Sequence, residues 1–149
     1  MNNNQENQTP KVAVLFAAYN GIDWIQEQVD SILSQKGVQI SIFISVDLSS
    51  DGTYDWCKSL ERNEQSVKVL QYGDYYGGAA KNFFRLINDV NINEYEFIAF
   101  SDQDDIWLSN KIEYAIKEIN DRNIDAFSSD VIAFWENGKE IYIKKSWSQ

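Results

Sequence analysis

The chain has 149 residues, 44% of them hydrophobic and 14% aromatic, which is enough to build one globular domain with a buried core. Thirteen basic and 23 acidic residues give a net charge of -10, which argues against nucleic acid as a partner because phosphate binding needs clustered Lys and Arg. The absence of histidine excludes Ser-His-Asp and Cys-His catalysis, and it excludes imidazole metal sites.

The chain begins with a polar segment, residues 1–10, which ends in the only proline, Pro10, and which we predict to be a disordered lead-in. This segment lacks the apolar stretch of a secretory signal peptide, and no apolar run elsewhere approaches the length that spans a bilayer. The single cysteine, Cys57, excludes an internal disulfide and is compatible with a reducing compartment. We therefore expect a cytoplasmic protein, with the inner face of the membrane as an alternative location.

The next part of the chain alternates strand and helix patterns. Residues 12–18, VAVLFAA, form a continuous apolar run that predicts a strand covered on both faces. Apolar residues then recur at helical spacing over residues 22–33, and Gly37 ends this helix. The β-branched run ISIFISV at residues 40–46 predicts a second strand, and a second helix is expected over residues 53–62.

The same alternation continues up to an acidic cluster. VKVLQY at residues 67–72 predicts a third strand, and a glycine-rich loop, GDYYGGAA, follows at residues 73–80. Residues 82–90 have a helical pattern, and EFIAFS at residues 96–101 predicts a fourth strand. Acidic side chains follow directly after this strand, at the point where a buried strand should end.

The last part of the chain starts with a helix that Ser109 can cap, followed by a strand near residues 126–129. Asn137-Gly138 predicts the turn of a β-hairpin. The alternating order of strands and helices predicts an α/β fold with a largely parallel sheet and right-handed crossovers. Ligands of such open sheets bind at the carboxyl ends of the strands, where the polar clusters AYNG, VDLSSDG, GDYYGG and SDQDD all fall.

The segment SDQDDIW, residues 101–107, crowds together the carboxylates of Asp102, Asp104 and Asp105. Such crowding raises the pKa of each carboxyl group unless a positive charge compensates. In an Asp-x-Asp segment that leaves a strand, one carboxylate can bind Mg²⁺ or Mn²⁺, which then bridges to a diphosphate. The other carboxylate can meet a sugar hydroxyl or a metal-bound water. The alternative is an acidic turn that caps the following helix.

Two other strand ends carry side chains that suit a nucleotide. Tyr19 can stack on a nucleobase or, alternatively, form an aromatic lid over the core, and Asn20 belongs to the tight turn behind it. Asp47 can accept a hydrogen bond from a base N–H or from a ribose hydroxyl. The nearby Asp51 is expected to cap the next helix instead.

The glycine-rich loop ends at Gly78, before a helix whose first turn contains Lys81. Backbone N–H groups at a helix start can approach a phosphate, and Lys81 adds positive charge there. Neither the P-loop pattern nor the GxGxxG pattern is present. The alternative is a flexible loop followed by a solvated lysine.

Together, these clusters make residues 11–135 resemble the family 2 glycosyltransferases of the GT-A fold, through VAVLFAAYNG, ISVDLSSDGT, GGAAKNF and FSDQDDIWLSNKI. The last stretch is most similar to bacterial rhamnosyltransferase-like enzymes of polysaccharide biosynthesis. The resemblance implies a Rossmann-like nucleotide-diphospho-sugar transferase fold with a mostly parallel sheet flanked by helices. It also implies a UDP- or dTDP-sugar donor, a glycan or lipid-linked acceptor, and Mn²⁺ or Mg²⁺ as cofactor.

The same resemblance assigns residues to the site. The metal would bind to Asp104 and Asp102. The donor nucleotide would contact Ala17, Tyr19, Asn20, Asp47, Gly78, Lys81, Asp102 and Gln103. The chain departs from the family pattern at Ala17-Ala18, where Pro-Thr is common, and at Val46, where a second Asp is common.

Residues 11–149 would then form a nucleotide-sugar-binding domain whose acceptor-binding half is absent or incomplete, so we expect a fold truncated on its C-terminal side. An inverting enzyme needs a carboxylate base, which we expect beyond Gln149. Hydrophobic surface at the truncated side would favour a homodimer. The alternative function is a non-catalytic nucleotide-sugar-binding module or an inactive fragment of such an enzyme. A receiver-like regulatory domain is disfavoured, because it needs acidic residues where this chain has AAYNG.

Overall fold

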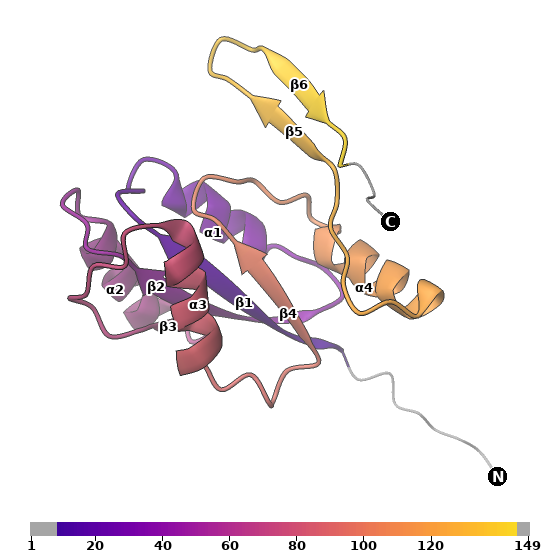
Figure 1. The fold of residues 1–149 in the computed structure, drawn as a ribbon, viewed down its shortest axis with the longest axis horizontal. Coiled ribbons are helices and arrows are strands. Elements are labelled where there is room, and N and C mark those ends of the chain that lie inside the picture. The colour runs from indigo at the N-terminus through magenta and orange to yellow at the C-terminus, as the bar shows by residue number, and fades with distance from the viewer. Residues whose placement is uncertain (1–8, 146–149) are drawn as a thin grey trace. The chain divides into compact units, whose positions relative to one another are not determined.

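The computed structural model describes residues 9–145 (Figure 1). The elements follow in the order β1 (Lys11–Ala18), α1 (Ile25–Leu33), β2 (Gln39–Val46), α2 (Thr53–Asn63), β3 (Val67–Val69), α3 (Ala79–Asp89), β4 (Phe97–Ser101), α4 (Lys111–Arg122), β5 (Val131–Phe134) and β6 (Glu140–Ile143). They belong to two compact units, which divide after Ile112 and are described separately. The lead-in predicted at residues 1–10 lies almost entirely outside the described residues.

The first unit is built on a four-stranded parallel sheet with the strand order β3-β2-β1-β4. The central strand β1 pairs with β2 from Lys11↔Gln39 onward and with β4 from Val12↔Phe97 onward. Every residue of β1 after Lys11 is buried, which explains its unbroken apolar sequence. The predicted α/β fold, a parallel sheet flanked by helices, is confirmed.

Helices pack on this sheet through their apolar faces. Leu15 and Ala17 of β1 form one buried cluster with Leu86 and Val90 of the α3 segment. Figure 1 shows α3 lying across the front of the sheet. The buried residues of α1 are Ile25, Gln28, Val29 and Ile32. Burial of these apolar side chains is the main favourable contribution to the packing of helix on sheet.

The start of α1 differs from the prediction. The helix begins at Ile25 rather than at residue 22, because the N–H groups of Trp24 and Ile25 close a turn on the carbonyl oxygen of Gly21, at 3.0 and 2.9 Å. The N–H of Ile22 donates instead to the Asp51 carboxylate at 3.0 Å. This turn therefore joins the end of β1 to the loop after β2, at the edge of the sheet where both strands end.

Two other boundaries also differ. β3 is three residues long, although the sequence predicts a strand over residues 67–72. The Leu70 N–H donates to the Ile44 carbonyl oxygen at 2.9 Å, and after this bond the chain leaves the sheet toward the glycine-rich loop. Asn110 directly precedes α4, so the predicted cap Ser109 lies one residue further from the helix.

In the second unit, the strand predicted at residues 126–129 is wrong. Those residues join no ladder, whereas β5 pairs antiparallel with β6, with Phe134 opposite Glu140. The predicted hairpin turn at Asn137-Gly138 is confirmed, with a φ of 80° at Gly138. The apolar run after residue 130 forms the strand because it has a cross-strand partner beyond this turn. Among the helices of residues 9–145, none combines the length and the apolar character needed to cross a membrane.

Candidate functional site

A cavity of about 530 Å³ lies at the carboxyl ends of β1, β2 and β4, next to the first turn of α3. Most of the predicted site residues line it, namely Ala17, Tyr19, Asp47, Gly78, Asp102, Gln103 and Asp104. It is also lined by residues of the same motifs that the sequence did not assign to the site, namely Ala18, Tyr75, Gly77, Ala79 and Asn82. The parallel sheet thus brings together segments that lie far apart in the chain.

Gln103 joins the ends of β1 and β4. Its side-chain amide accepts the Tyr19 N–H at 2.6 Å and donates to the Tyr19 carbonyl oxygen at 2.7 Å, so it extends the backbone pairing beyond the strands. Gly21 lies against this amide, and a Cβ at that position would overlap it. The Tyr19 side chain is 51% exposed and forms part of the cavity wall. Tyr19 therefore has a fixed backbone and an aromatic face that a ligand can reach.

Asn20 lies outside the cavity lining and connects the loop after β1 to the loop after β2. Its N–H donates to the Ser49 hydroxyl at 3.0 Å, and its side-chain oxygen accepts the Ser50 N–H at 2.9 Å. Its φ of 44° lies in the left-handed region, which Asn tolerates better than most residues. Asn20 therefore acts on the cavity indirectly, by holding these two loops together.

Asp47 is 3% exposed and organises the glycine-rich loop. One carboxylate oxygen accepts the N–H groups of Leu48 and Tyr76, both at 2.8 Å, and the other accepts the Gly77 N–H at 2.9 Å. These charge-assisted bonds compensate the cost of burying the carboxylate. The predicted hydrogen bond to Asp47 from a base N–H or a ribose hydroxyl would be made in addition to these backbone contacts.

Asn82 anchors the first turn of α3, and the sequence motifs did not single it out. Its buried amide donates to the carbonyl oxygens of Ser45, at 2.9 Å, and Ala18, at 3.4 Å, and it accepts the Ser45 hydroxyl. An amide one turn after a glycine pair, in GGAAKNF, is the sequence signal that points to such a role. Lys81, in the same turn, is exposed and does not line the cavity.

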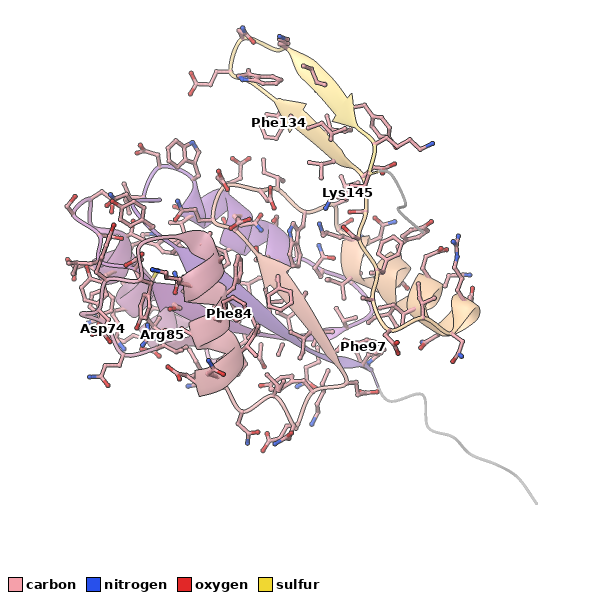
Figure 2. The ribbon with its side chains drawn as sticks, viewed as in Figure 1. Asp74, Phe84, Arg85, Phe97, Phe134 and Lys145 are labelled. Atoms are coloured by element: carbon pink, nitrogen blue, oxygen red, sulfur yellow. The ribbon has the colours of Figure 1, made fainter. Side chains whose placement is uncertain are left out.

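Arg85 is a further residue that the motifs did not indicate. Its guanidinium group lies 5.0 Å from the centre of the Tyr76 ring and donates to the Ser45 hydroxyl at 3.0 Å. It also donates to the Gln71 carbonyl oxygen. Figure 2 shows Arg85 near the loop segment that carries Asp74. Arg85 therefore supplies positive charge and packing to the glycine-rich loop, through tertiary contacts that leave no local pattern.

The acidic loop after β4 contributes Asp102 and Asp104 to the cavity lining. Burial raises the pKa of Asp102, and the negative charges of Asp105 and Asp104 raise it further. In the described part of the chain, no group of three or more His, Cys, Asp or Glu side chains is arranged to hold a metal ion. Two carboxylates suit Mg²⁺ or Mn²⁺ where phosphate oxygens and water complete the coordination. The donor set therefore fits a cation that binds together with a diphosphate.

The sequence profile described as Glycosyl transferase family 2 matches residues 13–147 of the chain. The chain belongs to this family. The match confirms the family resemblance of the sequence motifs, and it includes every residue that lines the cavity.

A curated relative of the chain is the dTDP-rhamnosyl transferase RfbG of Shigella flexneri, which is 46% identical over 135 residues. The aligned region covers 90% of this chain and 47% of that protein. This family 2 chain therefore spans about half the length of the relative it matches.

Two solved structures have a fold similar to that of this chain. TarS 1-349 of S. aureus, in complex with UDP, has a TM-score of 0.64 and 25% identity, covering 76% of this chain and 33% of that chain. The mannosyltransferase PcManGT of Pyrobaculum calidifontis, in complex with GDP-Man and Mn2+, has a TM-score of 0.64 and 19% identity. That match covers 74% of this chain and 32% of the other. Both likenesses support the GT-A fold that the sequence resemblance implied.

Proposed function

We propose that the cavity binds the nucleotide diphosphate part of a sugar donor and that the chain is the donor-binding part of a glycosyltransferase. The observation that carries this proposal is the meeting, in one cavity, of the Tyr19 ring, the start of α3, and the carboxylates of Asp102 and Asp104. These groups suit a nucleobase, a diphosphate and a divalent cation respectively. The cavity volume of about 530 Å³ is in the range of small-ligand sites.

The proposed donor is a dTDP-sugar, with a UDP-sugar as the second choice. The support for dTDP-rhamnose is the 46% identity to a protein named as a dTDP-rhamnosyl transferase. The proposed acceptor is a hydroxyl group of a glycan, free or lipid-linked, in the synthesis of a bacterial polysaccharide. The cytoplasmic location stays a prediction.

Each wall of the cavity has a proposed role in donor binding. Tyr19 would lie against the base, and Ala17 beside it leaves room because its side chain is small. Backbone N–H groups at Gly78 and the residues after it would donate to the diphosphate, as helix starts do for anions. Lys81 would add positive charge from outside the cavity lining, which reduces the repulsion between the acidic chain and an anionic donor.

Asp104 and Asp102 would hold a divalent cation, either Mn²⁺ or Mg²⁺. When bound, that ion stabilises the negative charge that develops on the departing diphosphate. We propose an inverting transfer, in which the acceptor hydroxyl attacks the anomeric carbon, the bond to the diphosphate breaks, and a carboxylate base takes the hydroxyl proton. Asp47 is unsuited to be this base, because its buried carboxylate already accepts the N–H groups of Leu48, Tyr76 and Gly77.

Calorimetric titration with dTDP and UDP, with and without Mn²⁺, tests the donor site. We expect micromolar binding that requires Mn²⁺ and that weakens at least about tenfold in Asp104→Ala. The matched control is Asp30→Ala, an exposed aspartate of α1 outside the cavity lining, which should leave binding unchanged. No nucleotide binding by the wild type under any of these conditions would contradict the proposal.

The metal arm of the same titration has its own expected outcome. Because the two cavity carboxylates form no complete metal site, Mn²⁺ alone should bind at least about tenfold more weakly than Mn²⁺ in the presence of dTDP. An assay of sugar transfer then distinguishes a glycosyltransferase from a non-catalytic nucleotide-sugar-binding module. This assay needs a protein as long as the matched relatives. If that protein binds the donor but transfers no sugar to glycan acceptors, the result favours the non-catalytic binding module.

A further inference from the structure

α1 and the turn after it carry a row of polar side chains that faces the protein interior. Gln28, Ser31 and Gln35 are three and four residues apart, so they lie on one face of the helix. Gln28 is 0% exposed and Gln35 is 8% exposed. Burying an amide costs free energy unless hydrogen bonds replace those made to water. The partners of this row lie in residues 101–112, the segment that carries the acidic loop.

Gln28 contacts the acidic loop at its start, middle and end. In the orientation that satisfies both ends of its amide, it accepts the Ser101 hydroxyl at 2.6 Å and the Trp107 indole N–H at 3.2 Å. The same amide donates to the Asp105 carbonyl oxygen. The residues between Ser101 and Trp107 belong to no helix or strand, so their backbone position depends on contacts of this kind.

Gln35 is chemically identical but holds a different segment. It donates to the Leu108 carbonyl oxygen at 2.8 Å and accepts the Ile112 N–H at 3.0 Å. These contacts fix the start of α4, beyond the acidic loop. Two buried amides of one helix segment therefore provide a test variant, Gln28, and a matched control, Gln35.

We propose that Gln28 is a positioning residue of the donor site, whose buried amide fixes the backbone of residues 101–107 so that Asp102 and Asp104 face the cavity together. Carboxylates this close repel one another, and a loop free to relax would move them apart. The inference rests on the proposed function, because cation binding is what requires the two carboxylates to stay together. A fixed loop also spares the ion the entropic cost of ordering its ligands.

The test compares Gln28→Met with Gln35→Met in the 149-residue chain. Methionine keeps a long, unbranched side chain but removes both hydrogen-bonding ends of the amide. The first readout is the Mn²⁺ dissociation constant in saturating dTDP, from the electron paramagnetic resonance signal of free Mn²⁺. The second is amide hydrogen exchange of residues 102–107 without metal, which reports the loop itself.

In Gln28→Met, we expect the Mn²⁺ dissociation constant to rise about tenfold or more, as it does when outer partners of metal ligands are removed. Exchange in the loop should accelerate by at least about tenfold, as expected when a local opening becomes easier. Gln35→Met should leave both quantities within about twofold.

A milder variant, Ser101→Ala, removes one of the bonds to Gln28, together with the contact of the Ser101 hydroxyl to the Asp102 carbonyl oxygen at 2.9 Å, and covers the case in which Gln28→Met does not fold. It should raise the Mn²⁺ dissociation constant about two- to fivefold. Unchanged Mn²⁺ affinity and exchange in a folded Gln28→Met, or equal losses in Gln35→Met, would overturn the inference. If Gln28→Met does not fold, an unchanged Mn²⁺ dissociation constant in Ser101→Ala would also overturn the inference. If the wild type binds no Mn²⁺ but Gln28→Met alone accelerates loop exchange, the proposed function fails and the positioning role stands.

Discussion

Asp51 lies outside the cavity lining and stabilises the fold through hydrogen bonds to the backbone and to Thr53. Its carboxylate accepts the Ile22 N–H at 3.0 Å, the Thr53 N–H at 3.0 Å and the Thr53 hydroxyl at 2.6 Å. Burial raises the pKa of Asp51, but these hydrogen bonds outweigh burial and hold the pKa below its ordinary value of 3.8. Asp51 accepts the first N–H of α2 as the predicted structural role implies, but Gly52 rather than Asp51 occupies the N-cap position.

Asp51→Asn should therefore reduce stability in a pH-dependent way. The folded-state pKa is lowered, so the stabilisation by Asp51 is present above pH 3.8 and is lost as the pH falls through the folded-state pKa. We expect a loss of about 1 kcal/mol in the free energy of unfolding at pH 7, shrinking below pH 3.8. Urea unfolding at several pH values measures this, with the exposed Asp23→Asn as control. A loss that is equal at pH 7 and at low pH would contradict it.

Gly21 is required by its neighbour rather than by its own backbone angles. A Cβ at this position would overlap the Gln103 amide, which pairs with both backbone groups of Tyr19. Gly21→Ala should therefore displace Gln103 and weaken nucleotide binding about tenfold, or about 1.4 kcal/mol. A double-mutant cycle identifies the cause, because Gly21→Ala should cost nothing further in a Gln103→Ala background. Additive losses in calorimetric titration would show that Gly21 acts through another contact.

The glycine-rich loop between β3 and α3 depends on Asp47 for its shape. Asp47→Asn would place an amide N–H against the N–H groups of Tyr76 and Gly77, so at least one of their bonds would be lost. We expect about 1–3 kcal/mol less stability, because a buried donor is left unsatisfied. Amide exchange at these two residues should accelerate. Asp74→Asn is the matched control in the same loop, where the carboxylate is exposed and accepts the Tyr76 hydroxyl, at 3.3 Å. Equal effects of the two variants would contradict this role of Asp47.

Strands and helices of the first unit could be predicted because each has an unambiguous local pattern. The apolar run of β1 forms a strand buried on both faces, and the β-branched run of β2 forms a strand that is buried toward its C-terminal end. The wrong strand at residues 126–129 shows where local pattern is insufficient. Those residues are apolar enough for a strand, but the ladder forms further along the chain, where β5 has a partner across Asn137-Gly138. Strand pairing is a non-local property that a single run of residues does not encode.

The residues of the candidate site also divide into those that could be predicted from the sequence and those that could not. Residues at strand ends, such as Tyr19, Asp47 and Asp104, could be predicted because the edge of a parallel sheet is a known place for ligands. Asn82 and Arg85 could not, because their partners at Ser45 are determined only by the packing of α3 on β2. Arg85 supports the glycine-rich loop from outside the cavity lining, whereas Asn82 lines the cavity and ties α3 to β1 and β2. Sequence motifs therefore indicated the cavity wall better than the contacts that support it.

Large apolar side chains are exposed in both units of the described chain. In the first unit, the edge strand β4 exposes Ile98 at 42% and Phe100 at 54%, and α3 exposes Phe84 at 65%. An uncharged edge strand with exposed apolar side chains favours pairing with another chain. The predicted homodimer is consistent with this surface and stays a prediction.

Sedimentation velocity over a concentration series tests self-association. We expect the sedimentation coefficient to rise with concentration, and we expect Ile98→Lys to weaken this rise by placing a charge on the edge of the sheet. Ile141→Lys, on the hairpin of the second unit, is the matched variant that tests the other exposed apolar surface. A wild-type chain that stays monomeric at every concentration would contradict the prediction.

The position of the cavity within the chain has a genetic consequence. All its lining residues lie between Ala17 and Asp104, and the first compact unit continues to Ile112. A recombination breakpoint near the start of α4 would therefore transfer the whole donor cavity intact and exchange only the segment on its C-terminal side. If the cavity binds the donor as proposed, such an exchange would alter acceptor choice while the activated sugar stays the same.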